Sequence, residues 1–437
     1  MNTQKLPVAA SKNSPHLPKN CPQLLMAALT VGTLAGMAGV RWPVLMTGSF
    51  LVFLTCPLAP EVLGFFTGGG LYLVGRTLDI GHEALLYFNA GAFLLPIFSL
   101  VVRLLYKKRA YALTAVFGLW ELWAMLGLGL LMLVRLPDSL FEEYGAQKIK
   151  YYLVNNAVSF FSPVLASAVW GKTGLCRFLK GVFLGGLALT MYFWVSKSYL
   201  DLPLNIYAVL NFNPIELSRL IGLFILLLVI GRGVAVPHPL TLFLVTAASA
   251  AMILLGARGP ALALVIALLC GGIVASRREF RLLPALVVSL FVLIAVYVSS
   301  HYWFSPDFFS LADNGRWQLY QAALTAFGQN PVMGAGTGSF AGISPEPGIY
   351  YPHNLFLESA AELGFPGLAL SLMFVFAPLA RLVLWRKKTK GTALAVSLLV
   401  FCLLNAMLSG DIPGNYLLWL AAGVAASLAM TDPERCR

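Results

Sequence analysis

One histidine stands out as a side chain that could do chemistry. His353 follows Pro352 in the segment YYPHNL and comes directly before a helical pattern. A neutral imidazole can take a proton from a hydroxyl group near neutral pH, so this position suits a general base. The competing interpretation is a histidine that only caps the helix or lies at a membrane interface. Polar neighbours and a pre-helix position distinguish His353 from the other four histidines, but on these residues alone both interpretations stay open.

Three arginines occupy the boundaries of predicted helices. Arg258 lies in the turn LGARGP, Arg316 opens a short amphipathic segment, and Arg219 opens an apolar one. An arginine at a membrane boundary is costly unless its side chain reaches water or meets a partner, and Asp313 and Glu216 are nearby partners for the last two. The guanidinium group also carries a rigid fork of donors that matches a phosphate. These arginines therefore predict a binding site for an anion such as a diphosphate.

The rest of the chain is unusually apolar, which indicates that membrane-spanning helices position His353 and the three arginines. Hydrophobic residues make up 59% of the 437 positions and charged residues only 11%, against about 25% charged in a soluble domain. A soluble fold could not bury so much apolar surface. We therefore predict an all-α polytopic membrane protein with about 12–14 transmembrane helices. Apolar segments lie near 23–40, 43–59, 61–76, 84–106, 110–134, 152–170, 178–196, 215–231, 239–256, 258–275, 282–300, 362–384, 391–410 and 413–430.

Basic residues set the predicted orientation. The formal charge of +12 comes from short clusters between apolar segments, which is typical of the positive-inside rule and not of nucleic-acid binding. Four clusters fall on one side, which we expect to be cytoplasmic together with both termini: Lys107–Arg109, Lys172–Lys180, Arg277–Arg281 and Arg386–Lys390. The stretches Arg135 to Tyr151, Lys197 to Pro214 and His301 to Gly364 are then loops on the opposite side.

The predicted organisation has five parts. A cytoplasmic tail (1–22) precedes transmembrane helices joined by short loops (23–300), a long periplasmic loop (301–364), the C-terminal transmembrane helices (365–430) and a second cytoplasmic tail (431–437). The loop is much longer than a connector needs to be, so we expect the chemistry there. Within it, residues 314–328 carry apolar positions at helical spacing, which predicts an amphipathic helix along the membrane surface.

Neither a metal nor an organic cofactor is expected. The six cysteines form no CxxC pair, no carboxylate cluster has metal-ligand spacing, and no phosphate-binding loop or dinucleotide fingerprint occurs. A nucleotide-sugar donor would usually need a soluble cytoplasmic domain, and none is predicted. A donor, if the protein uses one, must already be in the membrane.

Three groups of motifs follow one another along the chain: ARG at 257–259, GRW at 315–317 leading to NPVMGAGTGSF at 330–340, and HNLFL at 353–357 followed by ELG at 362–364. Together they resemble the core of the O-antigen ligase and O-antigen polymerase superfamily. Each motif alone is weak, but their order and placement on one face make the combination fairly specific. They cover about residues 250–370, and the remaining sequence is similar only in its many apolar segments.

The resemblance implies a metal-independent, inverting glycosyltransferase of the bacterial inner membrane with its active site on the periplasmic face. Its donor would be a glycan on undecaprenyl diphosphate. By position in the motifs, His353 matches the histidine that activates the acceptor, and Arg258 and Arg316 match the arginines that bind the diphosphate. Arg219 is a weaker candidate for the same role. Membrane lipid is the other expected partner.

Acceptor choice separates the branches of this superfamily. A ligase in lipopolysaccharide assembly would use a lipid A–core sugar, a polymerase the end of another lipid-linked repeat, and a protein O-oligosaccharyltransferase a serine or threonine. The compact loop slightly favours the ligase. From another class, a flippase for lipid-linked oligosaccharides would show repeated halves and charged residues at mid-membrane depth, and we find neither pattern in the sequence.

Overall fold

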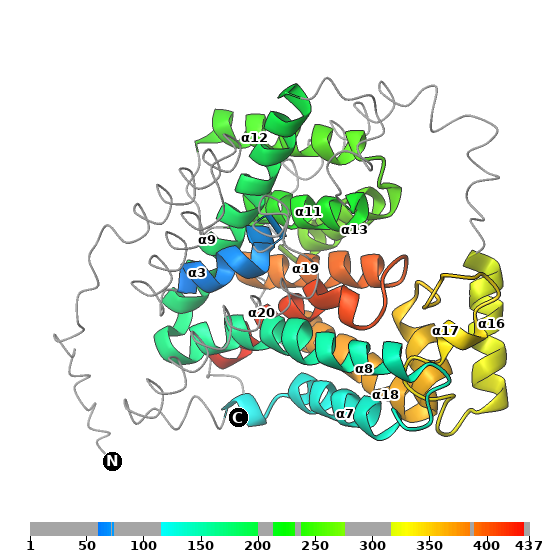
Figure 1. Ribbon diagram of the computed structural model, residues 1–437. Helices are drawn as coiled ribbons and strands as arrows, with labels where there is room; N and C mark the ends of the chain where they lie inside the picture. The colour runs from blue at the N-terminus through cyan, green and yellow to red at the C-terminus, as the bar shows by residue number, and fades with distance from the viewer. Residues whose placement is uncertain are drawn as a thin grey trace, which may run out of the picture. The chain divides into compact units, whose positions relative to one another are not determined.

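The computed structural model describes residues 60–70, 72–73, 115–199, 213–231, 237–275, 316–384 and 389–431. The following predictions lie outside them: the tail 1–22, residues 432–437 of the tail 431–437, the segments 23–40, 43–59, 84–106 and 282–300, and residues 301–315 of the long loop. Every regular element in the described residues is helical (Figure 1). Three helical stretches are long and apolar enough to cross a membrane, and shorter apolar helices accompany them. The prediction of an all-α membrane protein is confirmed.

Five of the predicted segments appear as helices with nearly the expected bounds. They are α11 (Pro214–Ile230), α12 (His238–Leu254), α13 (Arg258–Ala275), α19 (Lys390–Ala406) and α20 (Tyr416–Thr431). Side chains that precede two of them explain where they begin. The Asn213 side-chain oxygen accepts hydrogen bonds from the first turn of α11, and Thr389 does the same for α19. Such N-caps satisfy amide groups that have no partner within the helix.

The predicted segments 152–170 and 178–196 form one element without the expected loop between them. Helix α9 (Ala157–Tyr199) is interrupted only at Gly171, whose φ of 62° and ψ of −147° are not helical. A Cβ built on Gly174 would lie 2.0 Å from the Ala166 carbonyl oxygen, so the second half folds back against the first. The hydropathy dip around Lys172 marks this sharp turn. It does not mark a connector.

The predicted loop from Arg135 to Tyr151 is wrong in its second half. Only residues 135–141 connect α7 (Trp120–Val134) to α8 (Glu142–Tyr151), which continues through a short π-helix, η2 (Tyr152–Asn156), into α9. The sequence EEYGAQKIKY is too polar to suggest a membrane helix. Acidic residues at its start and basic residues at its end nevertheless suit a helix dipole.

Three further predicted segments differ in detail from the described helices. Helix α18 (Leu355–Leu384) begins seven residues before the predicted segment 362–384 and bends at Gly364, where φ is 67°. The described part of the predicted segment 61–76 contains a short helix, α3 (Pro60–Phe65), a π-turn, η1 (Phe66–Gly70), that ends in three glycines, and two more helical residues, 72 and 73. Helix α7 begins at Trp120, and within the described part of the predicted segment 110–134 residues 115–117 are helical as well.

The amphipathic helix of the long loop is present as α16 (Arg316–Gln329). Leu319, Ala323 and Ala326 form its buried face and pack in one cluster with Phe340 and Ala361. Of the apolar stripe predicted from the sequence, only Ala323 belongs to this face, whereas Trp317 and Leu324 are exposed. The predicted stripe was Trp317, Tyr320, Ala323, Leu324 and Phe327. Exposed apolar side chains on such a helix are suited to contact with lipid.

Close packing between small residues holds the helices together. Helix α9 packs against α3 and α20, α13 against α19, and α18 against α7 and α16 (Figure 1). At the crossing of α9 and α20, a Cβ on Gly423 would stand 2.3 Å from the Phe160 carbonyl oxygen. In a membrane, where lipid tails are as apolar as leucine, such close backbone approach is a main source of helix association.

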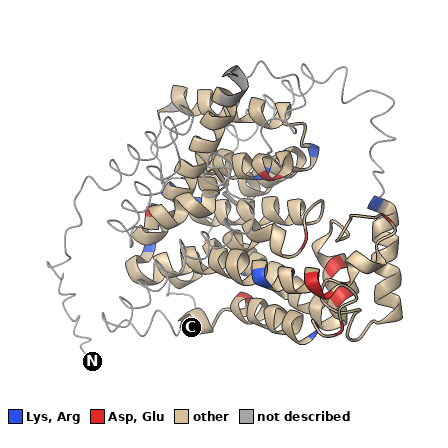
Figure 2. Ribbon diagram, in the orientation of Figure 1, with Lys and Arg blue, Asp and Glu red and all other residues tan. Residues whose placement is uncertain are grey.

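Charged residues are sparse on the helices and gather near α8 and the start of α18 (Figure 2). Two ion pairs elsewhere link helices: Arg381 of α18 bonds Glu121 of α7, and Arg177 of α9 bonds Glu61 of α3 at 2.5 Å. The third group, around Lys148, belongs to the candidate site.

Candidate functional site

The segments that carry Arg219, Arg258 and His353 meet at the end of α19 and at the connector between α19 and α20. Arg219 of α11 donates from Nη2 to the carbonyl oxygens of Asn405 and Ser409, at 3.0 and 2.8 Å. Gly259, next to Arg258 at the start of α13, lies against Leu408, since a Cβ there would be 3.4 Å from its side chain. The starts of α11 and α13 therefore lie at the same end of the helix bundle.

The starts of α8 and α18 reach this connector too. The Asn354 amide nitrogen is 3.5 Å from the Met407 carbonyl oxygen, and the Tyr144 hydroxyl donates to Asp411 at 2.9 Å. Asn354 precedes α18, and Tyr144 lies in the first turn of α8. Residues separated by more than 250 positions in sequence are thus gathered at one end of the bundle.

His353 has a specific conformation at this end. Its φ of 57° makes it the only non-glycine residue with positive φ in the described part of the chain. Asn354 caps α18 by accepting hydrogen bonds from the amides of Phe356 and Leu357, both at 3.1 Å. The His353 ring meets the Tyr351 ring edge-on, with centroids 4.7 Å apart. A left-handed residue of this kind is held by its surroundings and often marks a functional site.

The surroundings of His353 keep its ring neutral. Burial, followed by the positive charges of Arg316 and Arg219, lowers the pKa of His353 to about 4, while Asp411 acts in the opposite direction. Nδ1 is buried, and no described residue offers it a hydrogen bond. The imidazole can therefore accept a proton at neutral pH. An anion bound between the arginines would offset their field and make it a stronger base.

Arg258 and Arg316 are both half-buried and are the first residues of their helices, α13 and α16. The N-terminus of a helix carries the positive end of the helix dipole and favours anions, so each guanidinium lies beside a second source of positive potential. The charge of Arg316 is felt at His353. Asp313, the predicted alternative partner of Arg316, lies outside the described residues.

Arg219 is placed differently from the other two. Only 6% of it is exposed, and its Nη2 bonds carbonyl groups at the end of α19, where a positive charge also complements the helix dipole. The structure therefore gives Arg219 a structural contact that the sequence did not suggest. Its charge still contributes to the positive field on His353.

Sequence reasoning missed a buried charge cluster beside these residues, formed by Lys148, Glu358 and Glu362. Lys148 Nζ lies 2.5 Å from Glu358 Oε1 and 2.7 Å from Glu362 Oε2, and none of the three side chains is more than 1% exposed. Glu362 also accepts hydrogen bonds from the amides of Gly338 and Phe340. Two carboxylates at i and i+4 in an apolar helix require a cation. The i, i+4 spacing of Glu358 and Glu362 is the sequence signal from which this charge cluster could have been predicted.

The glycine-rich turn of residues 334–338 is wedged between α18, α8 and the 135–141 connector. Ala335 and Gly336 donate backbone hydrogen bonds to the carbonyl groups of Ala361 and Glu362, each at 2.9 Å. Gly336 has a φ of 104°, and a Cβ there would stand 2.4 Å from the Asp138 carbonyl oxygen. The turn therefore needs glycine both for its backbone conformation and for the space. It joins these three elements to one another.

Replacing Gly336 by alanine should consequently destabilise the protein by about 3 kcal/mol, from the unfavourable φ together with the backbone overlap. Thermal unfolding of the purified variant in detergent measures this loss. Gly328→Ala is the matched control, because Gly328 is helical and nothing lies within 4 Å of a Cβ there. The control should be neutral or slightly stabilising. Equal melting temperatures for Gly336→Ala and the wild type would contradict this role of the turn.

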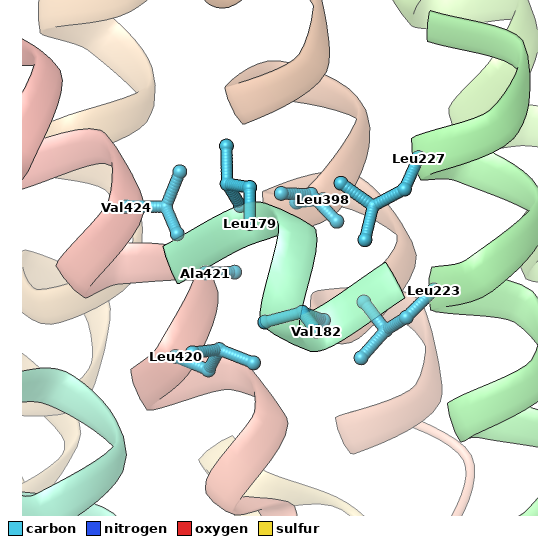
Figure 3. A pocket seen from close by; sticks show the side chains of 8 residues that line it. All are labelled: Leu179, Val182, Leu223, Leu227, Leu398, Leu420, Ala421 and Val424. Atoms are coloured by element: carbon cyan, nitrogen blue, oxygen red, sulfur yellow. The ribbon is translucent and has the colours of Figure 1, made fainter. Parts of the chain in front are cut away.

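The enclosed cavity in Figure 3 does not have the chemistry of a donor site. Eight apolar side chains from α9, α11, α19 and α20 line it, and its volume is about 10 Å³. A volume of that size holds at most about one water molecule, and an apolar lining would leave that water unbonded. It is a packing gap in the interior. The polar end of the bundle remains the place where a glycan and a diphosphate could bind.

Comparisons with known proteins bear on the same region. No curated protein matches the sequence. Residues 242–372 match the family model described as O-antigen ligase, a stretch that includes Arg258, Arg316 and His353 and nearly coincides with the predicted 250–370. The resemblance seen in the motifs is confirmed over residues 242–372, and this match supports the O-antigen ligase superfamily.

Proposed function

We propose that this protein transfers a glycan from undecaprenyl diphosphate to an acceptor hydroxyl on the periplasmic face of the inner membrane, and that the acceptor is a lipid A–core sugar. The observation that carries the proposal is the convergence on one half-buried histidine. His353 lies within the residues that match the O-antigen ligase family model. Its buried Nδ1 has no hydrogen-bond partner among the described residues, and the positive charges of Arg316 and Arg219 act on its ring.

In the proposed reaction the acceptor oxygen attacks the anomeric carbon of the donor sugar, on the face opposite the diphosphate. The bond between that carbon and the diphosphate oxygen breaks, and undecaprenyl diphosphate leaves with the electron pair. His353 takes the proton of the acceptor hydroxyl and later releases it to water. Inversion at the anomeric carbon follows from this single displacement.

Charge on the leaving diphosphate is the main electrostatic problem of the reaction. Arg258 and Arg316 can stabilise it with fixed guanidinium groups, and preorganised donors of this kind lower a barrier without a metal ion. Arg219, already bound to the carbonyl groups of Asn405 and Ser409, would support them through its field. Diphosphate binding would also raise the basicity of His353, because it cancels the positive charges that now lower its pKa.

Arg258→Lys or Arg316→Lys should lower the rate of glycan transfer by about 10- to 100-fold. An ammonium group cannot reproduce the two parallel hydrogen bonds that a guanidinium group donates to a phosphate. Proteoliposomes with undecaprenyl-diphosphate-linked glycan and lipid A–core measure it. Arg177→Lys is the control, because Arg177 pairs with Glu61 in another part of the bundle. Unchanged rates at both sites would contradict diphosphate binding by these arginines. So would activity that is lost in chelator and returns with Mg²⁺ or Mn²⁺.

The same assay separates the branches of the superfamily. Transfer to lipid A–core identifies a ligase, whereas elongation of the lipid-linked glycan identifies a polymerase. Modification of a serine or threonine peptide identifies a protein-directed enzyme. Movement of the donor across the bilayer without any new bond would instead identify a flippase.

A further inference from the structure

Three aromatic side chains form a stacked surface beside the candidate site. The rings of Phe141 and Tyr350 are stacked with centroids 6.1 Å apart and an angle of 24° between their planes, and the Tyr144 ring lies 5.2 Å from that of Tyr350. Phe141 and Tyr350 are 41% and 43% exposed. We call these three residues the aromatic platform. Nothing in the proposed donor chemistry uses it.

The aromatic platform is connected to His353 along two routes. Tyr350 is followed in sequence by Tyr351, whose ring contacts the His353 ring at 4.7 Å. Tyr144 donates its hydroxyl hydrogen bond to Asp411 at 2.9 Å, and the Asp411 carboxylate acts electrostatically on both Tyr351 and His353. A molecule resting on the platform would therefore lie next to the proposed base.

One ring of the platform is held in place by polar contacts. The Tyr144 ring is fixed by its hydroxyl bond to Asp411 and by the buried Lys148 ammonium, 5.2 Å from its centroid. The backbone of Phe141 is anchored as well, since its amide donates to Ser139 Oγ at 3.0 Å and its carbonyl oxygen accepts from Gly145 at 3.0 Å. A side chain held like that of Tyr144 loses little conformational entropy on binding.

The surroundings of the platform are polar, which decides what kind of molecule fits. Glu142 and Glu143, next to Phe141 in the first turn of α8, are both exposed. Carboxylates accept hydrogen bonds from hydroxyl groups but would be poor neighbours for an acyl chain. A sugar ring combines an apolar C–H face with a rim of hydroxyl groups. By contrast, the exposed face of α18 is lined by Phe365, Leu372 and Phe376, as lipid contact requires.

We propose that the aromatic platform is the acceptor subsite, where a sugar ring of the acceptor glycan stacks on Tyr350 and Phe141 and presents its hydroxyl group to His353. The proposal rests on the proposed function, because it assigns the second substrate of the same reaction. It also specifies that the acceptor is a carbohydrate. A protein serine or threonine has no ring face to stack in this way.

Tyr350→Ala should raise the KM for lipid A–core about ten-fold, which corresponds to the loss of about 1.4 kcal/mol of stacking. The KM for the undecaprenyl-diphosphate-linked donor should stay unchanged. Tyr350→Phe keeps the ring and should restore nearly the wild-type acceptor KM. Phe141→Leu should raise the acceptor KM as well. The experiment uses the full chain in proteoliposomes, with each substrate varied at saturating concentration of the other.

Phe243→Ala provides the control, because Phe243 is an exposed aromatic residue of α12 outside the platform, and neither KM should change. An unchanged acceptor KM in Tyr350→Ala, or an equal rise in both KM values, would overturn the proposal. Preferred transfer to a serine or threonine peptide would overturn it too. These results differ from failure of the proposed function, in which the wild-type protein itself forms no glycosidic bond.

Discussion

Replacing His353 by alanine should reduce glycan transfer by about 10²- to 10⁴-fold, the usual contribution of a general base, while the lipid-linked donor still binds. The donor would be held by Arg258 and Arg316, which the substitution leaves in place. His353 lies half-buried before the N-cap of α18 and its ring contacts Tyr351, so its removal opens no large gap in the helix bundle. The effect should appear mainly in kcat.

Transfer and donor binding must be measured separately in the purified variant, together with its melting temperature. If His353 only orients the acceptor, the defect should be smaller and should shrink at high acceptor concentration. The wild-type pH profile adds a check. Because the pKa of His353 is lowered to about 4, kcat/KM should not fall between pH 7 and pH 5, where an ordinary histidine would become protonated. Near-normal turnover in His353→Ala would remove this residue from the mechanism.

The largest loss of stability is expected from Lys148→Met. Lys148 is completely buried and is the cation between Glu358 and Glu362, so its removal leaves two carboxylates without a charge partner. Breaking a buried ion pair from one side typically costs about 3–5 kcal/mol. Glu362 also accepts hydrogen bonds from the backbone amides of Gly338 and Phe340. The glycine-rich turn should therefore become less ordered in the same variant. Denaturant or thermal unfolding in detergent measures the loss.

A triple variant tests whether the charge cluster is the cause. Lys148→Met combined with Glu358→Gln and Glu362→Gln removes all three charges and should recover part of the stability lost in Lys148→Met alone. Lys172→Met is the control, since Lys172 is an exposed lysine of α9, and it should change stability by less than about 0.5 kcal/mol. A Lys148→Met protein as stable as the wild type would show that the cluster contributes little.

Long apolar segments could be predicted from the sequence because hydropathy alone distinguishes them. Helices α11, α13 and α20 appear close to their predicted bounds. Helix α8 was missed because its polar composition is typical of a loop, and its stability depends on burying Lys148 against α18. The turn at Gly171 was missed for a different reason, since hydropathy does not record that two helical halves can meet without a connector.

For the candidate site too, the sequence motifs could be predicted and the contacts between distant segments could not. The motifs with Arg258, Arg316 and His353 could be found in the sequence, and their domain is confirmed, while their catalytic roles stay proposals. The partners of Arg219 at Asn405 and Ser409 could not be predicted, since they depend on how α11 packs near the end of α19. The aromatic platform joins Phe141 to Tyr350, and no sequence pattern links positions so far apart.

The most direct test of the proposed function is reconstitution of the purified protein in proteoliposomes with undecaprenyl-diphosphate-linked glycan and lipid A–core, in the presence of a chelator. Mass spectrometry of the lipid products reports the outcome. The proposed function predicts a glycan joined to lipid A–core, with release of undecaprenyl diphosphate, and almost none of this product with His353→Ala. Absence of any new glycosidic bond with lipid A–core, a second lipid-linked glycan or a peptide would contradict it.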